Sequence, residues 1–385
     1  MAIRNGKSYY SFSPVGFVRK KNSYLLFFSL VIIIITFSCQ KEKTPDIDNQ
    51  DLSEIPFSPQ EYKLETSSNY PEMNIPSDNT LTVEGISLGR SLFYDPIMSI
   101  DSTISCSSCH IHERGFKDNS ALSTGIDGRV GRRSSMSLLN VGYNRSNLFW
   151  DGRQPDLESQ ITAPVEDPNE LGHNWPALLD KLQNHHEYPV KFRKAFGIIK
   201  STDINEALVS KAIAQFERTL VSSGNSRYDR ILRGEATFTD DELQGYLMFF
   251  DVVPDLPDAE CGHCHTEPFF TTFEFKNNGI EAVENLTDFI DKGRGEVTGE
   301  VLDNGKFKIP TLINVFETAP YMHDGRFSTM EEVMEHYNSG GHRQLNTDPL
   351  IRPLGLSNRE VEQVLAFIKT LTDSSFLKNP DYSKP

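Results

Sequence analysis

Two runs of the pattern C-x-x-C-H constrain this chain more than any other feature of its sequence. They are formed by Cys106, Cys109 and His110, and by Cys261, Cys264 and His265. Two thiols at this spacing can add to the two vinyl groups of one haem, and the adjoining histidine can reach the iron from the proximal side. A redox dithiol or half of a zinc site is the alternative for a single run. Because the whole pattern occurs twice and uses four of the five cysteines, it predicts two covalently bound haem c groups.

The length and charge of the chain bound its general class. It has 385 residues, which is enough for about two domains. Its hydrophobic share of 37% and charged share of 24% are ordinary for a globular protein. The net charge of −16 argues against nucleic acid as a partner, because nothing in the overall balance offsets repulsion by phosphates.

The first 60 residues carry targeting signals and a linker. A basic stretch at 19–21 precedes an apolar run over 24–37, which is shorter than a membrane span of about 20 residues. The run ends just before Cys39 in a pattern that resembles a bacterial lipobox. We predict a lipoprotein signal peptide over 1–38, a lipid anchor at Cys39 and a flexible tether over 39–60. The alternative is an uncleaved membrane anchor. Either reading places the folded part in the periplasm, where haem c is attached, in contact with the membrane only through its anchor.

Apolar periodicity predicts short helices joined by long loops, with no convincing pair of strands. Val83–Tyr94, Trp175–Phe196 and Asp203–Val221 have apolar residues at helical spacing, and the second of these has a break at Pro189. The stretch 106–150 is rich in glycine and predicts a loop that wraps around a bulky cofactor.

Capping boxes predict three helix starts in the second half. They pair Thr239 with Glu242, Ser328 with Glu331, and Ser357 with Glu360. The polar segment 222–226 lies between apolar stretches and predicts a domain boundary. We therefore expect a mostly α fold of two cytochrome c-like haem domains with long loops, over residues 61–224 and 225–385.

Four motifs occur in the order found in a known family. They are the first C-x-x-C-H after Ile104-Ser105, Phe149-Trp150-Asp151-Gly152-Arg153, Pro164-Val165 followed by Glu170, and Thr318-Ala319-Pro320-Tyr321-Met322-His323-Asp324-Gly325. Together they resemble the bacterial di-haem cytochrome c peroxidase superfamily, nearer its MauG-type branch, over roughly residues 80 to 375. The resemblance implies that the N-terminal haem reacts with peroxide, while the C-terminal haem supplies or stores electrons.

The resemblance also implies three residues of the peroxide site. Glu170 falls where the family has its acid–base carboxylate, which moves a proton from one peroxide oxygen to the other; Glu166 is the competing carboxylate. Gln160 matches a glutamine that hydrogen-bonds bound peroxide. Trp150 matches a tryptophan between the two haems, although packing alone also explains a large aromatic residue there.

The far side of the first haem is expected to be open. Many family members block this iron with a distal histidine, but the matching stretch 125–128 has the sequence Gly-Ile-Asp-Gly. We therefore expect a five-coordinate iron at His110. Approach of His112 or His173 from elsewhere is the alternative.

The second haem is expected to have a sixth ligand. His265 is its proximal ligand, and Tyr337 aligns with the sixth position, where classical members have methionine and MauG-type proteins have tyrosine. Nearby alternatives are Met322, Met330, Met334 and His336.

A calcium ion between the domains is usual in the family. The carbonyls of Thr318 and Pro320 match two of its ligands, and Ser134 stands where the family has an asparagine side chain. Serine is a poorer donor, although water can complete a calcium shell.

Three functions compete at this point. The leading one is a peroxidase that reduces hydrogen peroxide at the first haem, with electrons from a small redox protein such as a cytochrome c or cupredoxin. The second is a MauG-type oxidase that modifies a protein or small molecule through a ferryl state. The third is a non-catalytic di-haem electron carrier, which would have no use for Glu170. Homodimerisation is common in the family.

Overall fold

The computed structural model describes residues 51–385, except residue 145. The predicted signal peptide, Cys39 and the first part of the predicted tether lie outside the described residues. None of the helices in the described part is long and apolar enough to cross a membrane.

The tether predicted over 39–60 is wrong for its last residues. Leu52 is fully buried in the main core, and its backbone N–H donates to the Ile199 carbonyl at 2.7 Å. Ile55 packs against the same core. Leu52 and Ile55 therefore attach this stretch to the core, although its overall composition is polar.

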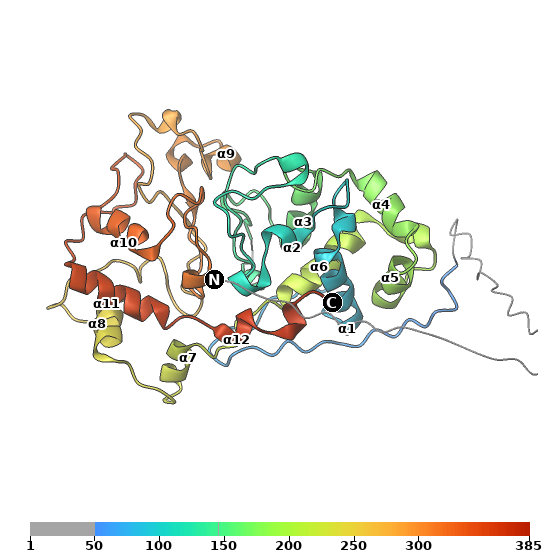
Figure 1. The fold of residues 1–385 in the computed structure, drawn as a ribbon, viewed down its shortest axis with the longest axis horizontal. Coiled ribbons are helices and arrows are strands. Elements are labelled where there is room, and N and C mark those ends of the chain that lie inside the picture. Colours follow the sequence, from blue (N-terminus) through green and yellow to red (C-terminus); the bar gives the residue numbers. More distant parts are fainter. Residues whose placement is uncertain (1–50, 145) are drawn as a thin grey trace, which may run out of the picture. The chain divides into compact units, whose positions relative to one another are not determined.

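Helix is the main regular structure of the described residues, so the expected fold class is confirmed at that level (Figure 1). Long irregular segments join the elements, and strands β1 (Phe275–Lys276) and β2 (Phe307–Lys308) form a small antiparallel pair, with Phe275 opposite Lys308. The α-helices are α1 (Val83–Tyr94), α2 (Cys106–Cys109), α3 (Leu157–Glu166), α4 (Trp175–Gln183), α5 (Tyr188–Phe196), α6 (Glu206–Arg218), α7 (Arg227–Leu232), α8 (Asp240–Phe249), α9 (Gly295–Thr298), α10 (Met330–Ser339), α11 (Asn358–Lys369) and α12 (Ser374–Leu377).

The helix starts follow the capping signals closely. The boxes at Thr239 and Ser357 are confirmed, because each side chain accepts from a backbone N–H in the first turn of α8 or α11. The box predicted at Ser328 is wrong by one residue. Thr329 caps α10 and pairs with Glu332, because two adjacent hydroxyl residues precede two adjacent glutamates.

The predicted helices of the first half are confirmed, one with its predicted bounds, one divided into two helices and one shorter than predicted. The helix over Val83–Tyr94 has the predicted ends. The segment Trp175–Phe196 is two helices, α4 and α5, and Pro189 lies in the first turn of α5, where a missing N–H costs little. The helix predicted over Asp203–Val221 begins later because Asn205 caps it, and it ends at Arg218.

Each half of the chain contains one close helix crossing. In the first half α1 packs against α6, and in the second half α8 packs against α11 (Figure 1). A glycine lies at each contact: a Cβ on Gly89 would overlap the Ala212 carbonyl, and one on Gly245 would overlap the Gln363 carbonyl. The backbones approach so closely that only glycine fits.

A loop pattern also recurs in both halves. Asn140 and Asn314 have the same backbone angles, φ 59° and ψ 19°, and each precedes a 3-10 turn, η4 (Val141–Tyr143) or η8 (Val315–Glu317). Further along, Leu148 pairs with Gln154 and Tyr321 pairs with Phe327 across short Asp-Gly-Arg turns. The recurrence places Trp150 and His323 at equivalent positions.

The segment 222–226, predicted as a domain boundary, is a buried junction. Ser222 is 2% exposed, and the side chains of Ser222 and Ser223 both donate to Asp373, which is fully buried. The described residues belong to one compact unit. The boundary near residue 224 stays a prediction.

Candidate active site

One cavity of about 720 Å³ lies between the two C-x-x-C-H runs. It is lined by residues of both, among them Cys109, His110, Cys261, Cys264 and His265. The fold therefore brings the two runs, which lie far apart in the sequence, to the walls of one cavity.

The two proximal histidines are held in the same way. Nδ1 of His110 lies 2.8 Å from the Phe116 carbonyl, and Nδ1 of His265 lies 3.0 Å from the Phe270 carbonyl. A carbonyl can only accept, so Nδ1 carries the hydrogen and Nε2 keeps its lone pair for a metal. Burial lowers the pKa of His110 and lowers the pKa of His265 to about 4, which keeps both rings neutral.

The cysteine thiols do not have the environment of a reactive redox dithiol. Burial raises the pKa of Cys106 to about 12, of Cys109 to about 11 and of Cys261 to about 12, and it raises the pKa of Cys264. A redox dithiol is activated by a lowered pKa, and these buried thiols have the opposite environment. The residues therefore fit two haem c groups, attached through thioethers and bound by His110 and His265.

His112 and His173 do not approach the cavity. Nε2 of His112 lies 2.9 Å from the Phe376 carbonyl, and neither residue lines the cavity. His323 does line it, and its ring stacks on Phe307 with centroids 3.6 Å apart.

Glu170 lines the cavity beside the first attachment site. It follows α3 in a turn where its N–H donates to the Asp167 carbonyl at 3.0 Å. Burial, with a smaller contribution from Asp167, raises the pKa of Glu170 to about 7, and Arg153 opposes this shift. Glu166, the competing carboxylate, is exposed and does not line the cavity.

The loop 125–128, which has no histidine to block the first haem, packs directly on the turn that contains Glu170. The Ile126 N–H donates to the Glu170 carbonyl at 3.0 Å. A Cβ on Gly125 would overlap the Asn169 carbonyl, so glycine is required for this approach. The short 3-10 turn η3 (Ile126–Gly128) thus lies against the backbone of Glu170.

Gln160 and Pro164 lie one helical turn apart on α3, and both line the cavity. Pro164 lies eleven residues after Arg153, and Tyr337 lies eleven residues after Arg326. Pro164 of the first half is therefore equivalent to Tyr337 of the second half, and a proline side chain cannot bind a metal. This is a second reason to expect an open position at the first haem.

Tyr337 and Met322 line the same part of the cavity. The Asn278 amide donates to the Tyr337 hydroxyl at 3.3 Å and lies 3.5 Å from the Met322 sulfur. Burial raises the pKa of Tyr337 to about 12. Tyr337 and Met322, two candidates for the sixth ligand of the second haem, therefore both contact the side-chain amide of Asn278.

Trp150 is fixed in a buried position on the cavity wall. It is 8% exposed, and its indole N–H donates to the Ser134 carbonyl at 2.8 Å. Its own carbonyl accepts from the Lys308 N–H at 2.8 Å. The indole is thus tied to the first half, and its backbone is tied to β2 of the second.

The predicted calcium ligands line the cavity but fit calcium poorly. Ser134, Thr318 and Pro320 offer neutral oxygens only. A guanidinium nitrogen of Arg114 lies 2.8 Å from the Ala319 carbonyl, so a cation adjoins the two expected carbonyl ligands. Calcium stays a prediction.

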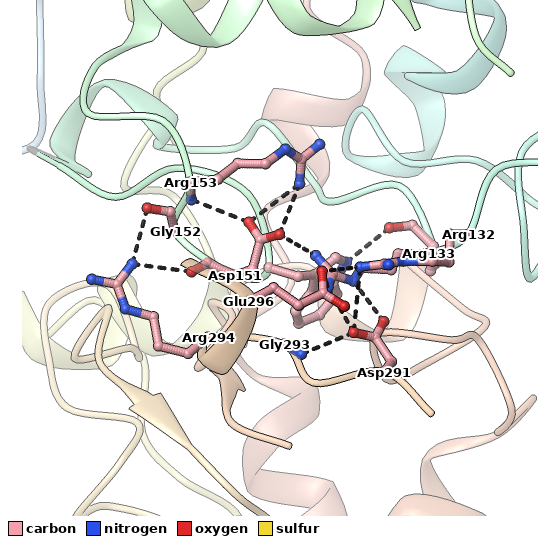
Figure 2. Close-up of polar contacts among 11 residues, drawn as sticks. Arg132, Arg133, Asp151, Gly152, Arg153, Asp291, Gly293, Arg294 and Glu296 are labelled. Atoms are coloured by element: carbon pink, nitrogen blue, oxygen red, sulfur yellow. Dashed lines mark hydrogen bonds and ion pairs between the residues drawn. The ribbon is translucent and has the colours of Figure 1, made fainter. Parts of the chain in front are cut away.

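A charged cluster joins the two halves at Asp151, which follows Trp150 in the sequence (Figure 2). Arg133 donates to Asp151 at 2.5 Å and to Asp291 at 2.6 Å, and its side chain is 9% exposed. Arg153 also bonds Asp151, at 3.2 Å, and its guanidinium lies 3.6 Å from the centre of the Phe149 ring. Asp151 comes from the first half and Asp291 from the second.

Sequence reasoning missed several residues of this cavity. Arg133 and Asn278 line the cavity, and Asp291 pairs with Arg133, but none of the three belongs to a motif. The repeated Asp-Gly-Arg turns were a usable signal, because they mark equivalent loops in the two halves. Lys117, a buried cation on the cavity wall, had no signal at all.

Comparison with known proteins gives consistent matches. A sequence profile described as "Di-haem cytochrome c peroxidase" matches residues 83–237. The chain is 34% identical over 300 residues to the cytochrome c551 peroxidase of Nitrosomonas europaea, covering 77% of this chain and 81% of the relative. It is 30% identical over 341 residues to the methylamine utilization protein MauG of Methylorubrum extorquens, covering 88% and 90%. A crystal structure of a MauG-like protein associated with microbial copper homeostasis matches with a TM-score of 0.75 and 32% identity, covering 84% of this chain and 99% of that one.

Proposed function

Because this chain belongs to the di-haem cytochrome c peroxidase family, and is therefore an oxidoreductase, we propose that it reduces hydrogen peroxide to water at a haem c bound by His110. Electrons are relayed through a second haem c bound by His265. The single observation that carries this proposal is the Glu170 carboxyl, which lines the cavity with a pKa raised to about 7.

A haem c held at the first site by Cys106, Cys109 and His110 would supply the redox-active iron for peroxide reduction. The conversion of one peroxide to two waters takes up two electrons and two protons. With a pKa near 7, Glu170 accepts a proton from one peroxide oxygen and returns it to the other at neutral pH. The Gln160 amide, on the helix α3 that precedes Glu170, hydrogen-bonds the bound peroxide.

Trp150 serves the transfer of electrons between the two haem sites. Its ring is fixed by the Ser134 carbonyl, and its backbone is bonded to Lys308 of the second half. A rigid aromatic group at this position shortens the gap that an electron crosses. Tyr337 completes the ligation at the second site, with Met322 as the neighbouring alternative.

The targeting segment of the sequence supports a location, and the location limits the choice of electron donor. The basic stretch, the apolar run and Cys39 support a periplasmic lipoprotein. A small cytochrome c or cupredoxin of the periplasm is the electron donor, and the protein can act as a homodimer, as is common in the family.

Replacement of Glu170 by Gln tests the acid–base role. Glu170→Gln removes the proton acceptor while keeping nearly the same shape, and we expect the reaction with peroxide to slow by about 10²–10⁴-fold. Stopped-flow absorbance of the haem bands measures this rate. Glu166→Gln, which changes an exposed carboxyl at the end of α3, is the matched control. An unchanged rate in Glu170→Gln would remove the assigned role.

A second function is favoured by Tyr337 and by the likeness to MauG. An oxidase of this kind modifies a protein or small molecule in place of accepting electrons from a cytochrome. Peroxide turnover with and without a reduced small cytochrome separates the two: a peroxidase consumes the cytochrome in proportion to peroxide. A resting protein that does not react with peroxide at all would leave only the electron carrier.

A further inference from the structure

Lys117 is a buried cation without a partner. It is 5% exposed and lines the cavity together with Cys109 and His110. Its Nζ has no hydrogen-bond partner among the described residues. A buried ammonium left in this state is strongly unfavourable, because it has lost its water and gained nothing in return.

The backbone fixes Lys117 close to the first haem site. It directly follows Phe116, whose carbonyl accepts from Nδ1 of the proximal His110. Its own N–H donates to the Arg114 carbonyl at 3.2 Å in the same tight turn. The adjacent Asp118 favours the charged form of Lys117 electrostatically, but no hydrogen bond joins it to the lysine Nζ, and its Oδ1 accepts from the Ser120 N–H.

Other cations on the same cavity wall already have partners. Arg133 binds Asp151 and a second carboxylate, and Arg153 binds Asp151 as well. Lys308 donates to the Phe273 carbonyl at 3.2 Å. Lys117 differs from these neighbours because its partner has to come from the group that fills the cavity.

We propose that the Lys117 ammonium donates a hydrogen bond to a propionate carboxylate of the first haem c and raises the midpoint potential of that haem. A haem tethered at Cys109 brings two carboxylates into the cavity that Lys117 lines. Ammonium-to-carboxylate bonds are among the strong hydrogen bonds of proteins. The inference rests on the haem assignment at the first site, but not on peroxide turnover.

The effect on potential follows from charge. Reduction adds one negative charge to the haem, and a nearby buried cation stabilises the reduced form more than the oxidised form because screening by water is weak there. Removal of the cation should therefore lower the midpoint potential of the first haem and affect the second haem less.

The test is a redox titration of the holoprotein, in which EPR follows each haem by its own signal. Lys117→Met removes the charge and keeps the length of the side chain, and Lys117→Arg keeps the charge. Lys194→Met removes an exposed cation on α5 of the same half and serves as the matched control. We expect Lys117→Met to lower the first potential only, while Lys117→Arg and Lys194→Met stay near the wild-type value.

Two results would overturn the inference. One is a Lys117→Met shift no larger than that of Lys194→Met, and the other is an equal shift of both haems. If Lys117→Met fails to fold, a Lys117→Arg potential that falls well below the wild-type value overturns it too. A wild-type holoprotein that has no peroxidase activity, while Lys117→Met still lowers the potential of the first haem, would contradict the proposed function alone. A pyridine haemochrome assay in which a Cys106→Ala and Cys109→Ala double variant holds as much haem c per chain as the wild type would contradict both.

Discussion

Glu217 on α6 is a buried carboxyl whose effect on the free energy of unfolding depends on pH. It is 4% exposed, and its Oε2 has no hydrogen-bond partner among the described residues. Burial raises the pKa of Glu217 from 4.5 to about 8; Arg218 opposes the shift and Glu158 adds to it. Between these two pH values the folded protein binds more protons than the unfolded chain, so the free energy of unfolding falls as pH rises.

Glu217→Gln should remove this penalty. We expect the variant to match the wild type at about pH 5 and to exceed its stability by roughly 2–4 kcal/mol at about pH 8, since one pKa unit corresponds to about 1.4 kcal/mol. Thermal unfolding of the holoprotein across this range measures the difference. Glu72→Gln, which changes an exposed carboxyl in the same half, controls for the loss of charge. A gain that does not grow with pH would contradict the raised pKa of Glu217.

At the scale of single residues, the sequence predicts what motifs mark and misses what only burial reveals. Glu170, Gln160 and Trp150 were named through their place in motifs, and all three line the cavity. Their roles stay predictions. Lys117 and Glu217 are ordinary charged residues in the sequence, because burial of a side chain depends on elements that lie far away along the chain.

At the scale of elements, the two helix crossings are the parts most sensitive to a single added carbon. Gly89→Ala places a Cβ on the Ala212 carbonyl of α6, and neither backbone can move without shifting its helix. We expect a loss of about 1–3 kcal/mol in the free energy of unfolding, although alanine favours helix by about 1 kcal/mol at an unrestrained position. Ser87→Ala, on the exposed side of α1, should change stability by less than about 0.5 kcal/mol.

Denaturant titration of both variants measures this difference. If Gly89→Ala proved as stable as Ser87→Ala, the close crossing of α1 and α6 would be wrong. The equivalent crossing of α8 and α11 at Gly245 offers a repeat of the same experiment in the second half.

Helix starts were predictable because capping is local chemistry. The caps at Thr239 and Ser357 were placed correctly from neighbouring residues, and the cap of α10 was misplaced by one residue. Helix ends were less predictable: Arg218 ends α6 although Leu220 and Val221 continue the apolar spacing. Those two side chains are buried after the helix ends, so apolar spacing alone does not distinguish helix from a packed loop.

At the scale of the whole molecule, the two halves share their helix crossings, their asparagine turns and their Asp-Gly-Arg turns. The sequence identity between the halves is confined to short segments such as Leu-Asn-Val and Ile-Asn-Val, so the repeat becomes clear only from the backbone. The cavity lies where the two halves meet, and the charged cluster of Figure 2 joins them there.

Arg133 is the member of that cluster whose loss should matter most. It is nearly buried and bonds Asp151 of the first half and Asp291 of the second. Arg133→Met would leave Asp151, which is 3% exposed, with the partly exposed Arg153 as its remaining partner. Removal of one partner from a buried ion pair costs about 3–5 kcal/mol, because the remaining charge stays without water.

Arg132 provides an internal comparison, since it is adjacent, pairs with Asp291 and Glu296, and has a side chain that is 58% exposed. Exposed ion pairs contribute about 0–1 kcal/mol, so Arg132→Met should be nearly neutral. Thermal unfolding of the holoprotein separates the two variants, and Arg133→Lys should lie between them because it keeps the charge but loses the forked geometry. Equal effects of Arg133→Met and Arg132→Met would mean that burial of this cluster does not hold the halves together. A large effect of Arg133→Met alone would show that the wall carrying Trp150 depends on one buried guanidinium.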